Sequence, residues 1–120
     1  MKRTRCTHFT PETGQCRCRA RVRMLVVTVH RISRTYQKYY ELTVCWPHYL
    51  EMERRARRGS ATIEIVYAVE IVTATVDGIE YELTLKPEGE LEVHNTSTDE
   101  TQDFKSDDAG REPWEQFLTS

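Results

Sequence analysis

The sequence predicts an α+β fold, in which a cysteine-bearing loop, a β-hairpin and a short helix precede an antiparallel β meander and a disordered acidic tail. Three observations predict this order: the spacing of the four cysteines, the runs of alternating β-branched residues, and the acidic, apolar-poor C-terminus. The hydrophobic fraction of 38% indicates a small core, and a small core usually needs a metal ion or disulfides to hold it together.

The N-terminal half begins with a loop and a hairpin. Residues 1–19 are polar and contain Pro11 and Gly14, which is typical of an irregular loop. Residues 20–31 and 35–44 are rich in β-branched and aromatic residues, so we expect two strands there. The short link between them favours an antiparallel hairpin.

A helix is predicted directly after the hairpin, from the segment CWPHYLEMERRARR. Pro47 suits the first helical position, where no backbone N–H is needed, and Gly59 predicts the end of the helix. His48, Met52 and Ala56 follow one another at a spacing of four, so they share one helix face that can point inward.

The strongest turn signal in the chain is Asp77-Gly78, which favours a type I′ hairpin within the all-β stretch 61–96. A turn at this place fixes the register of the flanking strands and puts their apolar residues on one face. The cross-strand pairs that it predicts are Val76 with Ile79, Ala74 with Tyr81, and Val72 with Leu83.

The apolar pattern changes parity before this hairpin. Apolar residues alternate over residues 63–71 on the opposite parity to those beside the turn, which predicts a bulge or a strand break near residues 69–72. A second turn at residues 87–89 precedes Leu91 and Val93, which we expect to begin a last short strand.

Residues 97–120 are acidic and poor in apolar side chains, so we expect disorder. Their end differs, because Trp114, Phe117 and Leu118 would share one helical turn and could dock onto the chain itself or onto a partner. The chain thus divides into a metal-binding hairpin–helix unit at 1–59, a β segment at 60–96 that can pack with it, and a tail at 97–120.

Charge is split between the two halves of the chain. Residues 1–60 carry fourteen Lys/Arg and four Asp/Glu, a net charge of +10, whereas residues 61–120 carry three and fifteen, a net charge of −12. A surface of one sign steers partners of the opposite sign, unless the two halves neutralise each other in the fold.

The sequence shows neither a bilayer-spanning apolar run nor a secretory signal at its N-terminus. We therefore expect a cytoplasmic protein without a membrane partner, in which cysteines stay reduced and serve as metal ligands. A disulfide such as Cys6–Cys16 is the alternative, and it would need an oxidising compartment.

Cysteine and histidine together favour Zn²⁺, which takes four such ligands in a closed structural site. Cys45-x2-His48 supplies one ligand pair, with His48 in the first helical turn, and Cys6-x9-Cys16 supplies the other across the loop. Cys18 is an alternative ligand, because residues two apart on an extended segment share one face. His8 and His30 are expected to be plain surface residues.

The stretch RCTHFTPETGQCRCRA…CWPH, within residues 3–58, resembles a short zinc-finger class of phage and bacterial proteins. That class combines Cys-x9-Cys, a loop with Thr and Gly, and Cys-x2-His. The matching positions are Cys6, Gly14, Cys16, Arg17, Ala20, Cys45 and His48. The resemblance implies a structural zinc ion and a treble-clef-like order, although the 28 residues between Cys16 and Cys45 exceed the usual length of the class.

Function is expected to be binding rather than catalysis, since four ligands would close the zinc site and no catalytic motif is present. The favoured partner is DNA or RNA, because arginines gather in two groups that can contact phosphates. The groups are Arg17, Arg19, Arg21 and Arg23, lining one face of the first strand, and Arg54, Arg55, Arg57 and Arg58, at the end of the helix. The alternative is a protein-binding regulator that uses the acidic half, as in phage proteins that act on host machinery.

Overall fold

The computed structural model describes residues 1–10, 14–58, 62–107 and 109–119. The chain forms two compact units. The cysteine unit is Thr4–Ala68, and the acidic unit is Met1–Arg3 together with Val69–Ser120. The chain passes from one unit to the other within strand β5 (Ile63–Val76), whereas the boundary expected from the sequence lies between residues 59 and 60.

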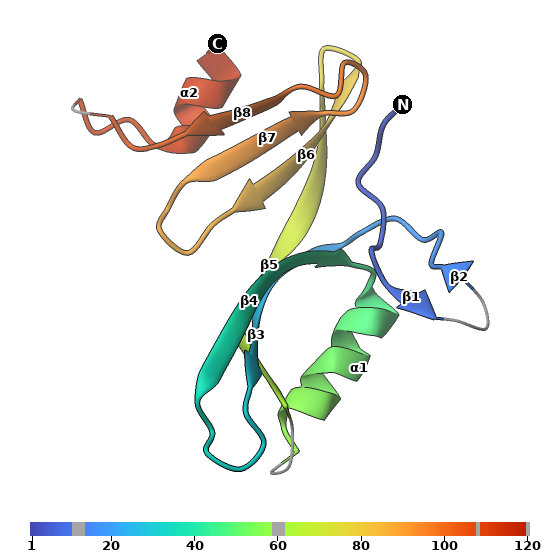
Figure 1. The fold of residues 1–120 in the computed structure, drawn as a ribbon. Helices are drawn as coiled ribbons and strands as arrows, with labels where there is room; N and C mark the ends of the chain where they lie inside the picture. Colours follow the sequence, from blue (N-terminus) through green and yellow to red (C-terminus); the bar gives the residue numbers. More distant parts are fainter. Residues whose placement is uncertain (11–13, 59–61, 108, 120) are drawn as a thin grey trace. The chain divides into compact units, whose positions relative to one another are not determined.

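The cysteine unit is built from a small ladder, a hairpin and a helix (Figure 1). Strands β1 (Phe9–Thr10) and β2 (Gly14–Gln15) form the ladder, and β3 (Val22–Val29) and β4 (Tyr36–Val44) form the antiparallel hairpin. In the sheet, β3 lies between β4 and β5. The predicted hairpin is thus confirmed.

Helix α1 (Trp46–Ala56) follows β4 directly and begins one residue before Pro47. The predicted helix is confirmed, while Gly59, its predicted end, lies outside the described residues. Tyr49 and Met52 of α1 pack against the core of the unit.

The core of the cysteine unit contains two of the candidate metal ligands. Alternate residues of β3 are buried on the side that faces this core, and Cys6 and Cys45 are buried among them, 0% and 5% exposed. The buried members are Cys6, Val22, Met24, Val26, Val44 and Cys45. Any rearrangement of the cysteines therefore disturbs the packing of the whole unit.

The acidic unit is an antiparallel meander that begins with the second part of β5. Strand β6 (Ile79–Leu85) pairs with β5 in the register that the sequence predicts, with Ala74 opposite Tyr81. Asp77 and Gly78 both have positive φ, 52° and 79°, as a type I′ turn requires. The N-terminal segment joins this unit, because the backbone N–H of Lys2 donates to the carbonyl of Thr96 at 2.6 Å.

The parity change in β5 is present without a break in the strand. Ile63 and Ile65 pack against the core of the cysteine unit, whereas Ala74 and Val76 pack against the core of the acidic unit. In this continuous strand the odd-numbered Ile63 and Ile65 pack inward in the first part, and the even-numbered Ala68 packs against the same core. The even-numbered Ala74 and Val76 pack inward in the last part.

The prediction of a disordered tail is wrong, and so is the prediction that the strand at Leu91 is the last. Strand β7 (Leu91–Asn95) pairs with a further strand, β8 (Thr101–Phe104), and helix α2 (Pro113–Thr119) follows. The average composition of this segment is acidic, but two of its aromatic residues are enough to anchor it. Phe104 and Phe117 pack with the buried Leu83, Leu91 and Val93.

Trp114, Phe117 and Leu118 of helix α2 were expected to dock together, but they differ in burial. Phe117 is buried and meets the rings of Tyr81 and Phe104 edge-on, with centroids 5.1 and 6.0 Å apart. Trp114 and Leu118 remain 41% and 64% exposed. Of the three, Phe117 alone therefore docks the motif onto its own unit. Neither described helix has the length and apolar character of a membrane-spanning segment.

An ionic bridge holds the turn between β7 and β8. His94 contacts two carboxylates at once, Glu82 through Nδ1 and Asp99 through Nε2, each at 2.8 Å. Burial alone would lower the pKa of His94, but the hydrogen bonds to Asp99 and Glu82 outweigh it and raise the pKa. The contact with His94 lowers the pKa of Asp99 in turn.

We expect Phe117→Ala to destabilise the acidic unit by about 3 kcal/mol, because it removes a buried aromatic side chain and leaves a cavity. Leu118→Ala, one residue on but exposed, should change the free energy of unfolding by less than about 0.5 kcal/mol. Urea unfolding of the full chain measures both. Similar losses in the two variants would show that α2 does not dock through Phe117.

The bridge at His94 predicts a pH dependence of stability. A histidine whose pKa is raised on folding stabilises the fold below its unfolded pKa of about 6.5, and this contribution is lost as the pH rises through the folded pKa. NMR titration of the His94 ring should therefore give a pKa above about 6.5, and Asp99→Asn should lower it. A pKa of His94 that stays the same in Asp99→Asn would contradict the bridge.

Candidate metal centre

Three chain segments bring the predicted ligands together. Gly14, with a positive φ of 76°, lies in β2, which pairs back onto β1. The backbone N–H of Cys16 then donates to the carbonyl of His8 at 2.8 Å, and that of Cys6 donates to the carbonyl of Cys18 at 2.9 Å. These bonds set the first ligand pair side by side, although nine residues separate the two in the sequence.

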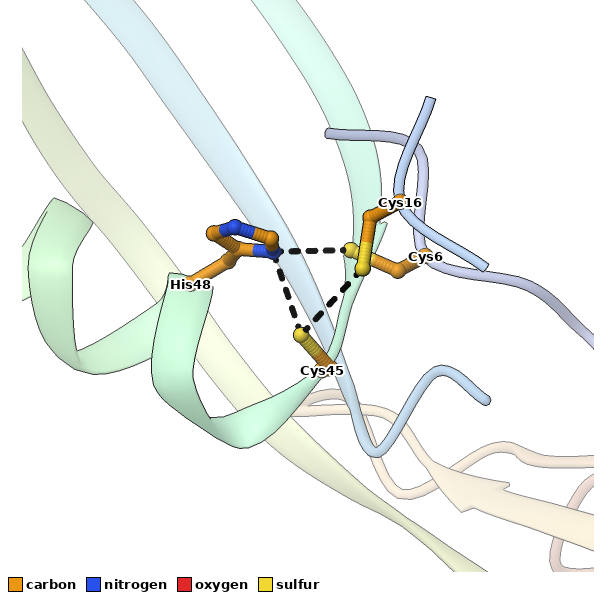
Figure 2. Close-up of side chains that lie close together, drawn as sticks. All are labelled: Cys6, Cys16, Cys45 and His48. Atoms are coloured by element: carbon orange, nitrogen blue, oxygen red, sulfur yellow. Dashed lines mark hydrogen bonds between the residues drawn. The ribbon is translucent and has the colours of Figure 1, made fainter. Parts of the chain in front are cut away.

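The second ligand pair stands at the beginning of α1. Cys45 is the residue that caps the helix at its N-terminus, and His48 lies in its first turn. Because Cys45 directly follows Val44, the buried last residue of β4, its position is fixed by both elements. Figure 2 shows the four side chains converging on one point from the loop and the helix.

The distances between the ligand atoms fit a tetrahedral metal ion. Nδ1 of His48 lies 3.3 Å from Sγ of Cys6 and 3.1 Å from Sγ of Cys45, and Sγ of Cys16 lies 4.0 Å from Sγ of Cys45. All four ligand atoms lie within 4.8 Å of one another. A tetrahedral zinc ion would place sulfur–sulfur pairs about 3.8 Å and sulfur–nitrogen pairs about 3.6 Å apart, given its usual bond lengths.

The four cysteines of the chain are free thiols, so the alternative of a disulfide is not realised. Burial raises the pKa of Cys6 and outweighs the hydrogen bonds from the backbone of Cys45 and His8, which lower it. A hydrogen bond from the backbone of Cys18 lowers the pKa of Cys16. Backbone donors of this kind favour the thiolate, the form of cysteine that binds a metal.

Cys18 is not one of the four residues whose ligand atoms lie within 4.8 Å of one another, although its side chain hydrogen-bonds to those of Cys16 and Cys45. Its residue is exposed, whereas Cys16 is half-buried and joins Cys6, Cys45 and His48 within ligand distance. The backbone of Cys18 nevertheless supports the site, through its carbonyl on Cys6 and its hydrogen bond to Cys16. Of the two alternatives that the spacing allowed, the geometry selects Cys16.

Two neighbours of the site were not predicted from the sequence. The ring of His8 stacks on that of His48, with centroids 3.8 Å apart and an angle of 21° between the planes. His8, His48 and Glu51 also bring one ligand atom each within 4.8 Å of one another. Since His48 turns Nδ1 to the thiols, its other ring nitrogen points away from them (Figure 2). The only signal in the sequence was the spacing of three between His48 and Glu51, which is typical of neighbours on a helix.

The first group of arginines does not line one face of a strand, as we expected. Strand β3 begins at Val22, so Arg17, Arg19 and Arg21 precede it, and only Arg23 lies in it. Arg23 is ion-paired with Glu41 of β4. The prediction failed because it extended the alternation of the strand into the loop that holds the metal ligands.

Arg17 instead contributes to a hollow beside the metal centre. This hollow has a volume of about 500 Å³ and is lined by Arg5, Gly14, Gln15, Cys16 and Arg17. Arg5, which was not among the predicted site residues, donates from its guanidinium to the carbonyl of Arg17 at 3.1 Å. Two guanidinium groups therefore stand at the loop that carries Cys16.

The second group of arginines lies at the end of α1, as predicted. Arg54, Arg55 and Arg58 are exposed and line, with Glu51, a hollow of about 350 Å³. Arg57 differs from them, because its guanidinium pairs with Glu53 at 2.8 Å. In the part of the chain that the structure describes, this helix end is thus a second concave surface dominated by positive charge.

Comparisons with protein families, with curated protein sequences and with solved structures gave no match to this chain. Any function proposed for the chain therefore rests on the geometry and the charge of its own residues.

We expect Cys16→Ser to reduce the metal content per chain sharply, because serine replaces a thiolate at a ligand position. Cys18→Ser is the matched control, two residues away and exposed, and it should leave the metal content unchanged. Elemental analysis of reduced, purified protein measures the content and identifies the metal. Equal loss in both variants, or no metal in the unmodified protein, would contradict the assignment.

Proposed function

We propose that Cys6, Cys16, Cys45 and His48 bind one structural zinc ion, and that the cysteine unit which this ion stabilises binds nucleic acid. Three thiols and an imidazole are the ligand set that zinc prefers, and harder cations such as Mg²⁺ prefer oxygen. Three of the distances between the ligand atoms, 3.1, 3.3 and 4.0 Å, support a tetrahedral ion.

The ion is proposed as structural rather than catalytic. Four protein ligands leave no open position for water or a substrate. Cys6 and Cys45 also belong to the hydrophobic core, so the ion would link the loop, the hairpin and the helix of the unit. The order loop, hairpin, helix, with the last ligand pair opening α1, supports the treble-clef-like arrangement that the resemblance implies.

The separation of charge is the observation that carries the nucleic-acid proposal. The cysteine unit, Thr4–Ala68, contains twelve Lys/Arg and five Asp/Glu, a net charge of +7. Positive charge concentrated on one unit attracts the phosphate backbone. The hollows beside Cys16 and at the end of α1, each with guanidinium groups in its lining, supply the bidentate donors that suit phosphate oxygens.

Protein binding by the acidic unit is the second candidate function. This unit contains fourteen Asp/Glu and five Lys/Arg, a net charge of −9, and it exposes Trp114 and Leu118 on α2. A folded acidic surface with exposed aromatic and aliphatic groups suits a basic protein partner. In this second function the chain would act as a regulator, in the manner of phage proteins that act on host machinery.

We expect the affinity for DNA or RNA to fall steeply between roughly 50 and 200 mM salt, because binding releases counterions from the phosphates. The double variant Arg54→Gln/Arg55→Gln should lower the slope of log affinity against log salt by about 2. The matched control is Arg57→Gln on the same helix end, whose guanidinium is paired with Glu53. A salt-titrated anisotropy assay measures these slopes, and an affinity that ignores salt would contradict the proposal.

A further inference from the structure

Strand β4 exposes aromatic side chains where a sheet would normally bury or omit them. Tyr36, Tyr39 and Tyr40 are 62%, 56% and 42% exposed. In the cysteine unit β4 follows β3 at the end of the order β4-β3-β5, and its first six residues are all exposed. Exposed aromatic rings that gather on one strand mark a candidate interaction surface.

A bulge in the β3–β4 ladder brings two of these rings onto one face. Residues three apart on a regular strand point to opposite faces. The register shifts between Thr28 and Val29, however, so that Tyr39 lies opposite Val27 and Tyr36 lies opposite Val29. Since Val27 and Val29 are two apart on β3, Tyr36 and Tyr39 share a face, about 6.6 Å apart along the strand.

Tyr40 and Lys38 occupy the other face of β4. They lie opposite Val26 and Thr28, and the ammonium group of Lys38 stands over the ring of Tyr40, 5.1 Å from its centroid. Tyr40 is thus already engaged by a cation. The bulge therefore sorts the tyrosines into an open pair, Tyr36 and Tyr39, and a single engaged ring.

The ring of Tyr36 is held at its hydroxyl end while its faces stay open. A hydrogen bond between its hydroxyl and the carboxylate of Glu64 raises the pKa of Tyr36. Glu64 belongs to β5, so this bond reaches across β3. The same carboxylate pairs with Arg34 at 3.4 Å. A ring fixed in this way loses little conformational freedom when another ring stacks on it.

Two exposed arginines lie in the turn that leads to Tyr36. Arg31 and Arg34 belong to this turn between β3 and β4, and Arg34 shares its charge with Glu64. The face is therefore both aromatic and cationic, which suits an anionic ligand with flat rings. Single-stranded nucleic acid has this chemistry, because its base faces are open to stacking, whereas a duplex keeps them stacked inside.

We propose that Tyr36 and Tyr39 form a stacking platform for the bases of single-stranded nucleic acid, with Arg31 and Arg34 of the adjacent turn contacting its phosphates. This inference rests on the proposed nucleic-acid function and names its ligand class. Stacking tolerates any base, so the platform gives affinity for single strands without sequence preference.

The experiment compares a fluorescein-labelled oligo-dT strand with a duplex of the same length, at one salt concentration, by anisotropy. The unmodified protein should bind the single strand more tightly. Tyr36→Ala/Tyr39→Ala should weaken binding to the single strand by at least about tenfold, as expected for the loss of two stacking contacts. It should leave the salt slope unchanged, because no charge is removed.

Two variants separate stacking from a structural role. Tyr39→Phe keeps the ring and should bind like the unmodified protein. Tyr40→Ala, on the opposite face of the same strand, should retain affinity for the single strand. Equal affinity for duplex and single strand, or full binding by the double alanine variant, would overturn the platform while the nucleic-acid function stands. Absence of binding to either nucleic acid at low salt would instead overturn the proposed function.

A measurement on the unmodified protein covers the case in which the double variant fails to fold. Oligonucleotides that contain bromodeoxyuridine cross-link under ultraviolet light to aromatic residues stacked on the base. Cross-links are expected at Tyr36 or Tyr39. Cross-links confined to the arginines of α1, or a dimer in which a second copy covers β4, would overturn the inference.

Discussion

The fold of the cysteine unit depends on the meeting of four ligand atoms where three chain segments cross. Three thiols and one imidazole lie within 4.8 Å of one another, and two of the thiols belong to a core that is itself small. Thiolates packed so closely repel each other unless a cation lies between them. A backbone hydrogen bond lowers the pKa of Cys16 and favours its thiolate, whereas burial raises the pKa of Cys6. A cation bound between the ligands would favour the thiolate of Cys6 as well.

The position of the four ligands also determines where the basic side chains of this unit lie, because the same chain segments carry both. The loop that carries Cys16 also carries Arg17, and the helix that starts near His48 ends with Arg54 and Arg55. One ion would thus set the positions of arginines from segments that are far apart in the sequence. In the acidic unit the comparable constraint is different, because apolar contacts of Phe104 and Phe117 close a meander whose surface is strongly negative.

Features fixed by local chemistry were predictable from the sequence. The turn at Asp77-Gly78 sets its own register, and the ligand set could be read from residue type and spacing. Features that depend on distant partners were not. Composition predicted disorder after residue 97, because it averages over the acidic residues and misses Phe117, which is buried against strands far away in the sequence. Likewise, Arg23 was predicted to share a strand face with Arg17, Arg19 and Arg21. The alternation of residues does not by itself show that β3 begins only at Val22.

The bulge in β4 shows how one extra residue in a strand changes which side chains share a face. Without the shift between Thr28 and Val29, Tyr36 would share a face with Tyr40, and Tyr39 would lie alone on the other face. Bulges cost ladder hydrogen bonds and are retained mainly where they aim a side chain. The chain has few apolar residues for its cores, yet it leaves these tyrosines exposed on the unit with positive charge. The proposed stacking role would give a function both to the bulge and to the exposed rings.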